Sequence, residues 1–188
     1  MKKQLLLFIL GAILGSFYDG FHTHSGTTYY PDPWILKMAW WVPLNFGLAI
    51  LAVANSHVLM DRVLGRPDRP QSWVSVVLGL FLFGVVYWLS GFLPTDSMKY
   101  LWVYTGALLI WLMFDRTWQG LVLALMTGVV GSAVEITLIA LKLFFYVRPD
   151  FMGIPLWLPG LYIAASVTVG NLGRKVLGQE SPSALQGS

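Results

Sequence analysis

The sequence predicts an all-α integral membrane protein, a bundle of six transmembrane helices with both termini in the cytoplasm. Hydrophobic residues make up 56% of the 188 residues and charged residues only 11%, against roughly 25% charged in soluble domains. Apolar stretches of membrane-spanning length alternate with short charged turns. Because so few charged residues cannot cover a water-exposed fold, we expect the bilayer to be the solvent.

The first span is expected at about residues 4–18, after Lys2 and Lys3. A cleaved signal peptide is the alternative, because a basic start precedes a short apolar stretch. The apolar character continues to Phe21, and the Gly11-x-x-x-Gly15 pattern suits close helix packing in a membrane. Both observations favour a retained helix.

The next segment, 19–34, is predicted to be a polar, turn-rich loop. Five more spans follow, at about 35–58, 73–93, 100–114, 118–145 and 154–172. Proline or charged residues stand between them, where the helices should end. We expect a single domain over residues 1–176 and a disordered polar tail over 177–188.

The Lys and Arg residues fix the orientation that we predict. With six spans, one side of the membrane holds eight of them: Lys2, Lys3, Arg62, Arg66, Arg69, Arg116, Arg174 and Lys175. The other side holds four: Lys37, Lys99, Lys142 and Arg148. Positive charge is retained in the cytoplasm, so both termini are predicted to be cytoplasmic.

Glu135 falls near the middle of the fifth span, where a charged side chain is costly unless it faces protein or a wet cavity. Ala124, Gly128 and Ser132 are spaced by four and form a ridge of small residues on the same span. We expect the ridge to admit another helix and Glu135 to point toward it. The acid would anchor a ligand or bind a proton, or it would be neutral and hydrogen-bonded to that helix.

Pro43 is predicted to interrupt the backbone hydrogen bonds within the second span, and Asn45 lies one half-turn beyond it. Freed backbone groups can line a cavity that holds polar ligand atoms. The alternative is that these residues serve helix packing.

Asp115 and Arg116 occupy the shortest predicted turn. Asp115 or Thr117 is expected to be the N-cap of the fifth span, and the turn to be exposed for a partner protein.

Enzymatic chemistry finds little support. No nucleophile, zinc-protease or phosphate-loop motif is present, and the absence of cysteine excludes thiol catalysis and disulfides. His22 and His24, with Asp19 and Asp32, are of the residue types that bind metal ions. A single H-x-H pattern in a loop is weak evidence for a metal site. We predict no enzyme, no cofactor, no metal and, given a net charge of only +3, no nucleic-acid partner.

Six blocks in order carry a family resemblance: AWWVP (39–43), DRVLGRP (61–67), FDR (114–116), PDF (149–151), WLP (157–159) and GNLGR (170–174). Together they resemble the Insig family, the insulin-induced gene proteins. The resemblance implies six transmembrane helices, cytoplasmic termini and no known catalysis. It also implies, from the animal members, residence in the endoplasmic reticulum, oxysterol binding within the membrane and retention of the partner protein Scap. The family's FDR aspartate, tied to that partner, corresponds to Asp115.

The chain departs from the animal proteins at several points. Asn45 and Phe46 stand where those proteins carry cysteines, Met98 replaces a polar amide, and Glu135 with Ile136 replaces Thr-Gln. The short loops and missing tails predict a minimal, prokaryotic member. We expect an integral membrane location, in the cell inner membrane if the protein is prokaryotic and in the endoplasmic reticulum if it is eukaryotic.

We therefore predict a membrane protein that holds one sterol or acylglycerol-type lipid between its helices. Its site residues are expected to be Trp40, Pro43, Asn45, Tyr104 and Glu135. Two alternatives remain open: a proton-coupled transporter that uses Glu135, and a ligand-free scaffold that binds a polytopic membrane protein through Asp115 and Arg116. Self-association through Gly11 and Gly15, or through the ridge of the fifth span, would give a homo-oligomer.

Overall fold

The computed structural model is a bundle of six helices, and it describes residues 1–65 and 72–178. The helices are α1 (Lys2–Ser25), α2 (Val42–Leu64), α3 (Trp73–Phe92), α4 (Asp96–Phe114), α5 (Trp118–Ala140) and α6 (Leu158–Leu177). Five of them, α1 to α5, are long and apolar enough to cross a membrane. The predicted all-α membrane bundle is thus confirmed.

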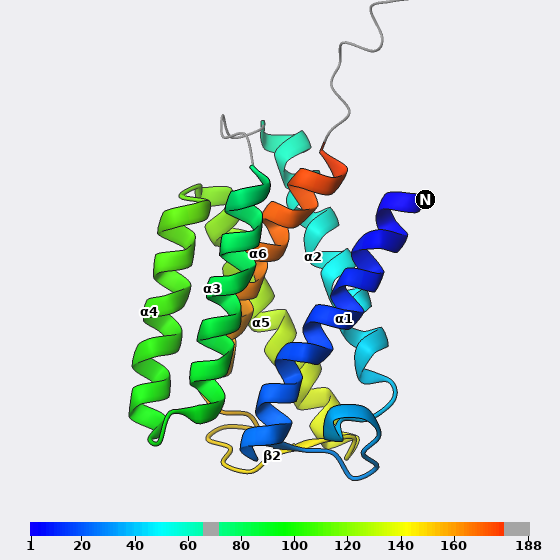
Figure 1. Ribbon diagram of the computed structural model, residues 1–188. Coiled ribbons are helices and arrows are strands. Elements are labelled where there is room, and N and C mark those ends of the chain that lie inside the picture. The colour runs from blue at the N-terminus through cyan, green and yellow to red at the C-terminus, as the bar shows by residue number, and fades with distance from the viewer. Residues whose placement is uncertain (66–71, 179–188) are drawn as a thin grey trace, which may run out of the picture.

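The sixth helix, α6, runs through the middle of the bundle and packs against α2, α3, α4 and α5 (Figure 1). Most of its residues are buried, including the polar Ser166, Thr168, Asn171 and Arg174. A helix surrounded by protein needs no lipid-facing apolar side chains and can carry hydrogen-bonding groups instead. This position explains why α6 can carry these polar residues, although it is not among the five helices apolar enough to cross a membrane.

Glycines set the closest helix contacts in the bundle. Any Cβ at Gly11 would lie 2.9 Å from Ile50 Cβ, and one at Gly15 would collide with the ring of Phe46. Gly11 and Gly15 therefore seat α1 on α2 within one molecule. The small residues of α5 do the same against α6, because a Cβ at Gly128 would lie 3.2 Å from Ile163. Both predicted self-association surfaces are used inside the monomer, which corrects that expectation.

Three helices, α3, α4 and α5, begin at a serine or threonine N-cap, a position that these residues favour. Ser72, Thr95 and Thr117 accept hydrogen bonds from the backbone amides of Ser75, Met98 and Gly120, respectively. The expected N-cap of the fifth span is thus Thr117, and its partner Asp115 ends α4 instead.

A two-stranded antiparallel sheet closes the end of the bundle opposite the N-terminus and the end of α6 (Figure 1). Strand β1 (Thr28–Tyr29) follows α1, and strand β2 (Phe145–Tyr146) follows α5. A short 3-10 turn, η1 (Ile35–Lys37), leads into α2. The sheet joins the loop after α1 to the loop after α5.

Two predicted boundaries are wrong in ways that affect the site. The first helix continues to Ser25, so Asp19, His22 and His24 lie within α1 and not in a loop. The second helix begins at Val42 and not at residue 35, so Pro43 stands in its first turn. Amides of the first turn have no partner within a helix, so this proline interrupts nothing.

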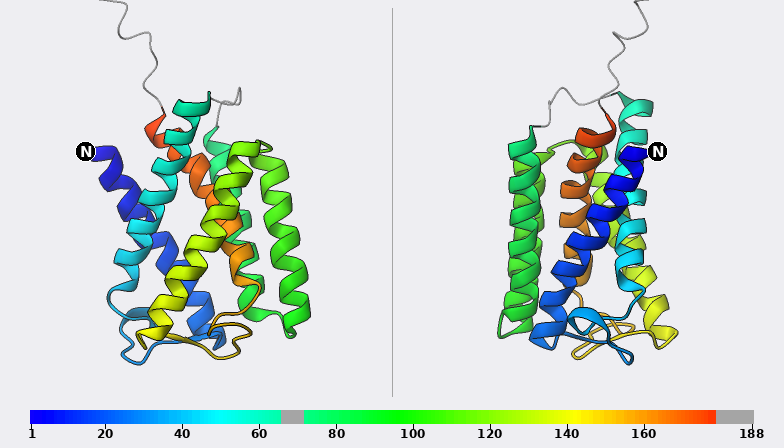
Figure 2. Two further views of the ribbon diagram at one scale, coloured as in Figure 1. Left: turned by 180° about the vertical axis from the view of Figure 1, so that it is seen from behind. Right: turned by 45° about the vertical axis from the view of Figure 1, so that its right-hand side comes forward.

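The N-terminus and the end of α6 lie at the same end of the bundle (Figures 1 and 2). An even number of crossings requires this arrangement. Their placement in the cytoplasm stays a prediction. The expected polar tail falls almost wholly on residues 179–188, outside the described residues.

Candidate functional site

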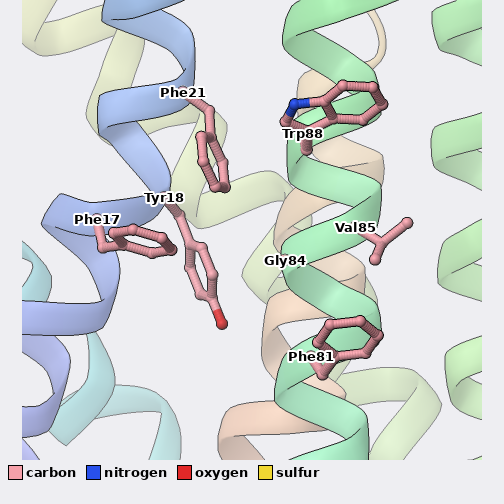
Figure 3. Close-up of a pocket in the computed structure, with 7 residues that line it drawn as sticks. All are labelled: Phe17, Tyr18, Phe21, Phe81, Gly84, Val85 and Trp88. Atoms are coloured by element: carbon pink, nitrogen blue, oxygen red, sulfur yellow. The ribbon is translucent and has the colours of Figure 1, made fainter.

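An apolar groove of about 390 Å³ lies between α1 and α3 (Figure 3). Phe17, Tyr18 and Phe21 of α1 form one wall, and the other wall consists of Phe81, Gly84, Val85 and Trp88 of α3. Aromatic rings thus dominate a space of the size that small-molecule sites occupy.

Gly84 brings the two walls of the groove together. A Cβ at this position would lie 2.9 Å from the ring of Tyr18, so any larger residue would push α1 away. The Tyr18 ring is held by an edge-on contact to Phe83, and its hydroxyl donates to the carbonyl of Leu80 at 3.0 Å. Because that hydroxyl is already satisfied, the groove presents almost only hydrocarbon to a ligand.

The groove opens on the outer surface of the helices. Phe17, Phe81 and Trp88 are 54%, 64% and 45% exposed. In a membrane this surface faces acyl chains, so a lipid can enter sideways without crossing water.

Two carboxylates lie near the sheet end of the bundle, Asp19 buried and Glu135 half-buried, and each is held by tyrosines. Asp19 accepts a hydrogen bond from Tyr30 at 2.8 Å, with the hydroxyl of Tyr87 at 3.5 Å. Glu135 accepts from Tyr146 at 2.7 Å and from Tyr162 at 2.5 Å. The expectation that Glu135 points toward the helix against its ridge is confirmed, because Tyr162 belongs to α6.

Two tyrosines of this cluster lie outside the helices, Tyr30 after β1 and Tyr146 in β2, and both are donors and not acids at neutral pH. Burial raises the pKa of the Tyr146 hydroxyl well above its ordinary value, and the charge of Glu135 adds to the effect. Burial likewise raises the pKa of Tyr30, with a further contribution from Asp19. Phenols that stay protonated can serve as permanent hydrogen-bond donors to the two acids.

The tyrosine cluster touches the groove. Tyr18 stacks on Tyr87 with ring centroids 5.9 Å apart, and Tyr87 lies 4.3 Å from the ring of His22. His22 is almost fully buried, and its Nε2 is 2.7 Å from Ser90 Oγ. His22 therefore fixes α1 to α3 beside the groove. Among the described residues no group of three or more metal-ligating side chains comes together.

A buried ionic cluster lies at the opposite end of the bundle. Arg174 of α6 pairs with Asp61 of α2 at 2.7 Å and with Asp115 of the α4–α5 turn at 2.9 Å. Asn171 supports the pair by accepting from Arg174 at 3.2 Å and donating to the carbonyl of Phe114 at 3.1 Å. The cluster joins three segments that are distant in sequence.

The α4–α5 turn is only half exposed, which corrects the predicted surface. Arg116 is exposed and adopts a positive φ of 57°. Asp115 is 3% exposed and also accepts from the amide of Thr117 at 3.1 Å. An aspartate in this position holds the turn in shape, while Arg116 is the side chain that a partner could touch.

The five predicted lipid-site residues do not line the groove. Trp40 is 66% exposed before α2, Pro43 lies in the first turn of α2, and Asn45 is half-buried on the same helix. Tyr104 donates to the carbonyl of Leu156 at 2.7 Å. Glu135 accepts hydrogen bonds from two tyrosines. The polar groups of Tyr104 and Glu135 are therefore both hydrogen-bonded within the protein. The lipid-binding roles of all five stay predictions.

Sequence reasoning missed the groove itself, although a signal was present. Phe17 and Phe21 are four residues apart, and Phe81, Gly84, Val85 and Trp88 recur at helical spacing. Each set marks one helix face. Nothing in the sequence shows that the two faces meet.

Comparisons with known proteins agree with this architecture. The insulin-induced protein (INSIG) family matches residues 2–177. The chain is 29% identical to insulin-induced gene 1 protein from Danio rerio and to that from Gallus gallus, covering 94% of this chain and 72% of each relative. A solved structure of the mycobacterial Insig homologue MvINS, from Mycobacterium vanbaalenii, superposes with a TM-score of 0.86 at 23% identity, over 96% of this chain and 97% of that one. A cross-linked trimer of MvINS superposes with a TM-score of 0.85 at the same identity and coverage.

Proposed function

The chain belongs to the insulin-induced protein (INSIG) family, and on that premise we propose that it holds one membrane lipid in the groove between α1 and α3. The resemblance carried by the six sequence blocks is thereby confirmed at the level of the family. The observation that carries the proposal is the groove itself, an aromatic space that opens toward the bilayer. The protein acts by binding and not by catalysis.

The groove supports a ligand recognised through its hydrocarbon. Each Å² of apolar surface that leaves contact with water contributes about 25 cal/mol, but a lipid leaves other lipids and not water. Close packing against Tyr18, Phe21 and Trp88 must therefore supply the preference, as it does between helices in membranes. A ring system or one acyl segment fits about 390 Å³, so sterols and acylglycerols are both suitable.

Thermal stability of the purified protein tests this proposal. Cholesterol or diacylglycerol, added to detergent micelles, should raise the melting temperature of the wild type. Trp88→Ala removes one wall and should abolish most of the increase. Trp102→Ala is the matched control, because Trp102 is 48% exposed on α4 and lies outside the groove. Equal increases in the two variants would contradict the proposal.

A partner protein is a second candidate ligand, favoured by the α4–α5 turn. Arg116 is exposed there at a fixed backbone angle, above a buried ionic cluster that keeps the turn rigid. We expect Arg116→Ala to lose a partner in affinity purification without altering stability. Retention of every partner by Arg116→Ala would contradict a binding role for this turn.

A homo-oligomer is also proposed, because the mycobacterial homologue has been cross-linked as a trimer. The glycines of α1 and the ridge of α5 are occupied within the monomer. Other faces must therefore form such an assembly. Mass photometry in detergent would report the number of subunits, and a monomer at all concentrations would contradict the proposal.

Proton-coupled transport through Glu135 is the remaining alternative. Its carboxylate lies between two helices and accepts from two phenols, an arrangement that suits a proton site as well as a structural one. Transport predicts pH-dependent flux in liposomes that Glu135→Gln abolishes. Absence of flux in the wild type would exclude this function.

A further inference from the structure

At the end of the bundle that carries the N-terminus and the end of α6, the described residues expose more basic than acidic side chains. Four basic side chains are exposed there, and Lys175 is half-buried beside them. The exposed four are Lys2 and Lys3 at the start of α1, Arg62 near the end of α2 and Arg116 in the α4–α5 turn. Figures 1 and 2 show these segments at one end of the molecule in each view. We call these five residues the cationic face.

The acids that the structure describes at this end do not offset that charge. Within residues 1–65 and 72–178 the carboxylates at this end are Asp61 and Asp115, which are 7% and 3% exposed. Both pair with the buried Arg174, at 2.7 and 2.9 Å. A single internal arginine thus removes both carboxylates from the surface, and the exposed basic residues keep no described acidic partner.

The opposite end carries four described basic residues, and its acids are placed differently. Lys37, Lys99, Lys142 and Arg148 are placed there among acids that remain at the surface. These acids are Asp32 and Asp150, which are exposed, and Asp96, which is half-buried. The two ends thus differ in the disposition of their acids as well as in the count of basic residues.

Lys175 shows that the cationic face is organised at headgroup depth. Its ammonium lies 5.7 Å from the ring centroid of Trp73, the first residue of α3. The Trp73 side chain is 54% exposed, and indole rings favour the interface between hydrocarbon and headgroups. A cation held over this ring by cation–π attraction stays where lipid phosphates lie.

From this arrangement we propose that the cationic face binds the headgroups of anionic phospholipids in its own leaflet. Anionic leaflets attract basic residues near the surface of a membrane protein, and the contribution of each basic residue corresponds to about a fivefold gain in affinity. Several phosphates in one plane can meet several cations at once, which a free phosphate ion cannot. The site is separate from the α1–α3 groove, so it stands whether or not the groove holds a lipid.

Native mass spectrometry of the full chain from mixed micelles tests the proposal, with phosphatidylglycerol and phosphatidylcholine of identical acyl chains competing. The wild type should retain phosphatidylglycerol at least tenfold over phosphatidylcholine, and the preference should fall with added salt as screening increases. One variant replaces four exposed residues with glutamine: Lys2, Lys3, Arg62 and Arg116. It should lose most of the preference while its melting temperature stays within a few degrees of wild type.

A matched variant replaces three basic residues of the opposite end with glutamine: Lys37, Lys142 and Arg148. It should retain the preference for phosphatidylglycerol. An equal loss in both variants, or no preference in the wild type, would overturn the proposal. So would a wild-type melting temperature that rises as much with inorganic phosphate as with phosphatidylglycerol at equal ionic strength, because the site would then be one for free anions.

Discussion

The guanidinium Nη1 of Arg174 lies 2.9 Å from Oδ2 of Asp115, and both side chains are buried. The same guanidinium contacts Asp61, so one residue of the central helix holds α2 and the α4–α5 turn. This relationship joins the two sequence blocks DRVLGRP and FDR to the third, GNLGR. Asp115 therefore has a structural role, and it lies beneath the exposed Arg116 through which we propose that a partner protein binds.

Removing the arginine from this cluster should be severe. Arg174→Ala removes the guanidinium that pairs with the buried carboxylates of Asp61 and Asp115, and breaking a buried pair costs about 3–5 kcal/mol. We expect a large fall in melting temperature in detergent. Arg116→Ala, at the exposed neighbour of Asp115, should change the unfolding free energy by no more than about 0.5 kcal/mol. Similar losses in the two variants would show that Arg174 is not the link between these segments.

Gly131 should be intolerant of any side chain. A Cβ there would lie 2.5 Å from Cδ1 of Tyr162, the residue that donates to Glu135. Gly131→Ala should displace the ring and lower stability by about 1–3 kcal/mol. The control is Gly79→Ala, where the nearest atom is 3.6 Å away, on Thr168. If Gly79→Ala is as damaging as Gly131→Ala, close packing of α5 on α6 is not the cause.

The stability of the protein at high pH should depend on the ionisation of Tyr146, in strand β2. Because burial and Glu135 raise the pKa of Tyr146, the folded protein keeps its phenol proton after the unfolded chain has lost it. The resulting stability is present below about pH 10, the ordinary tyrosine value, and is lost as pH rises through the folded pKa. Melting temperatures measured from pH 8 to 11 should fall less steeply for Tyr146→Phe than for wild type. Parallel curves would contradict this assignment.

The same substitution has a cost at neutral pH. Tyr146→Phe removes one of the two phenols that donate to Glu135, and a typical intramolecular hydrogen bond contributes about 0.5–1.5 kcal/mol. Tyr29→Phe, on the adjacent strand at 57% exposure, is the control and should be nearly neutral. Chemical or thermal unfolding of the two variants at pH 7 measures the difference. Equal stability of the two would mean that the Tyr146 hydrogen bond is not needed.

The bundle was predictable because apolar length and charge placement act locally along the chain. Spans three to five were placed within a few residues, and the small-residue ridge correctly indicated a packed face. The central position of α6 was not predicted, since only the structure shows that Ser166, Asn171 and Arg174 are buried within protein. Pro43 was misread because the sequence shows a proline but not which turn of the helix it occupies.

The site was less predictable than the fold. Asp19 and His22 read as a loop because polar residues near a span end usually leave the helix, yet Tyr30 and Ser90 reach them from other segments and satisfy them inside it. Contacts between residues 68 positions apart, as between His22 and Ser90, leave no mark in a single sequence. The groove depends on two such faces meeting around Gly84, and so lay beyond what periodicity could show.

Native mass spectrometry of protein purified from its own membranes tests the lipid-binding account most directly. The wild type should carry one tightly held lipid that survives detergent exchange. The Gly84→Leu variant should lose this lipid, because the leucine side chain would push α1 away from α3 and occupy the groove. Val129→Leu, on the exposed face of α5, should keep it. A wild type that carries no lipid, or a Gly84→Leu variant that carries the same lipid in the same amount, would contradict binding in the α1–α3 groove.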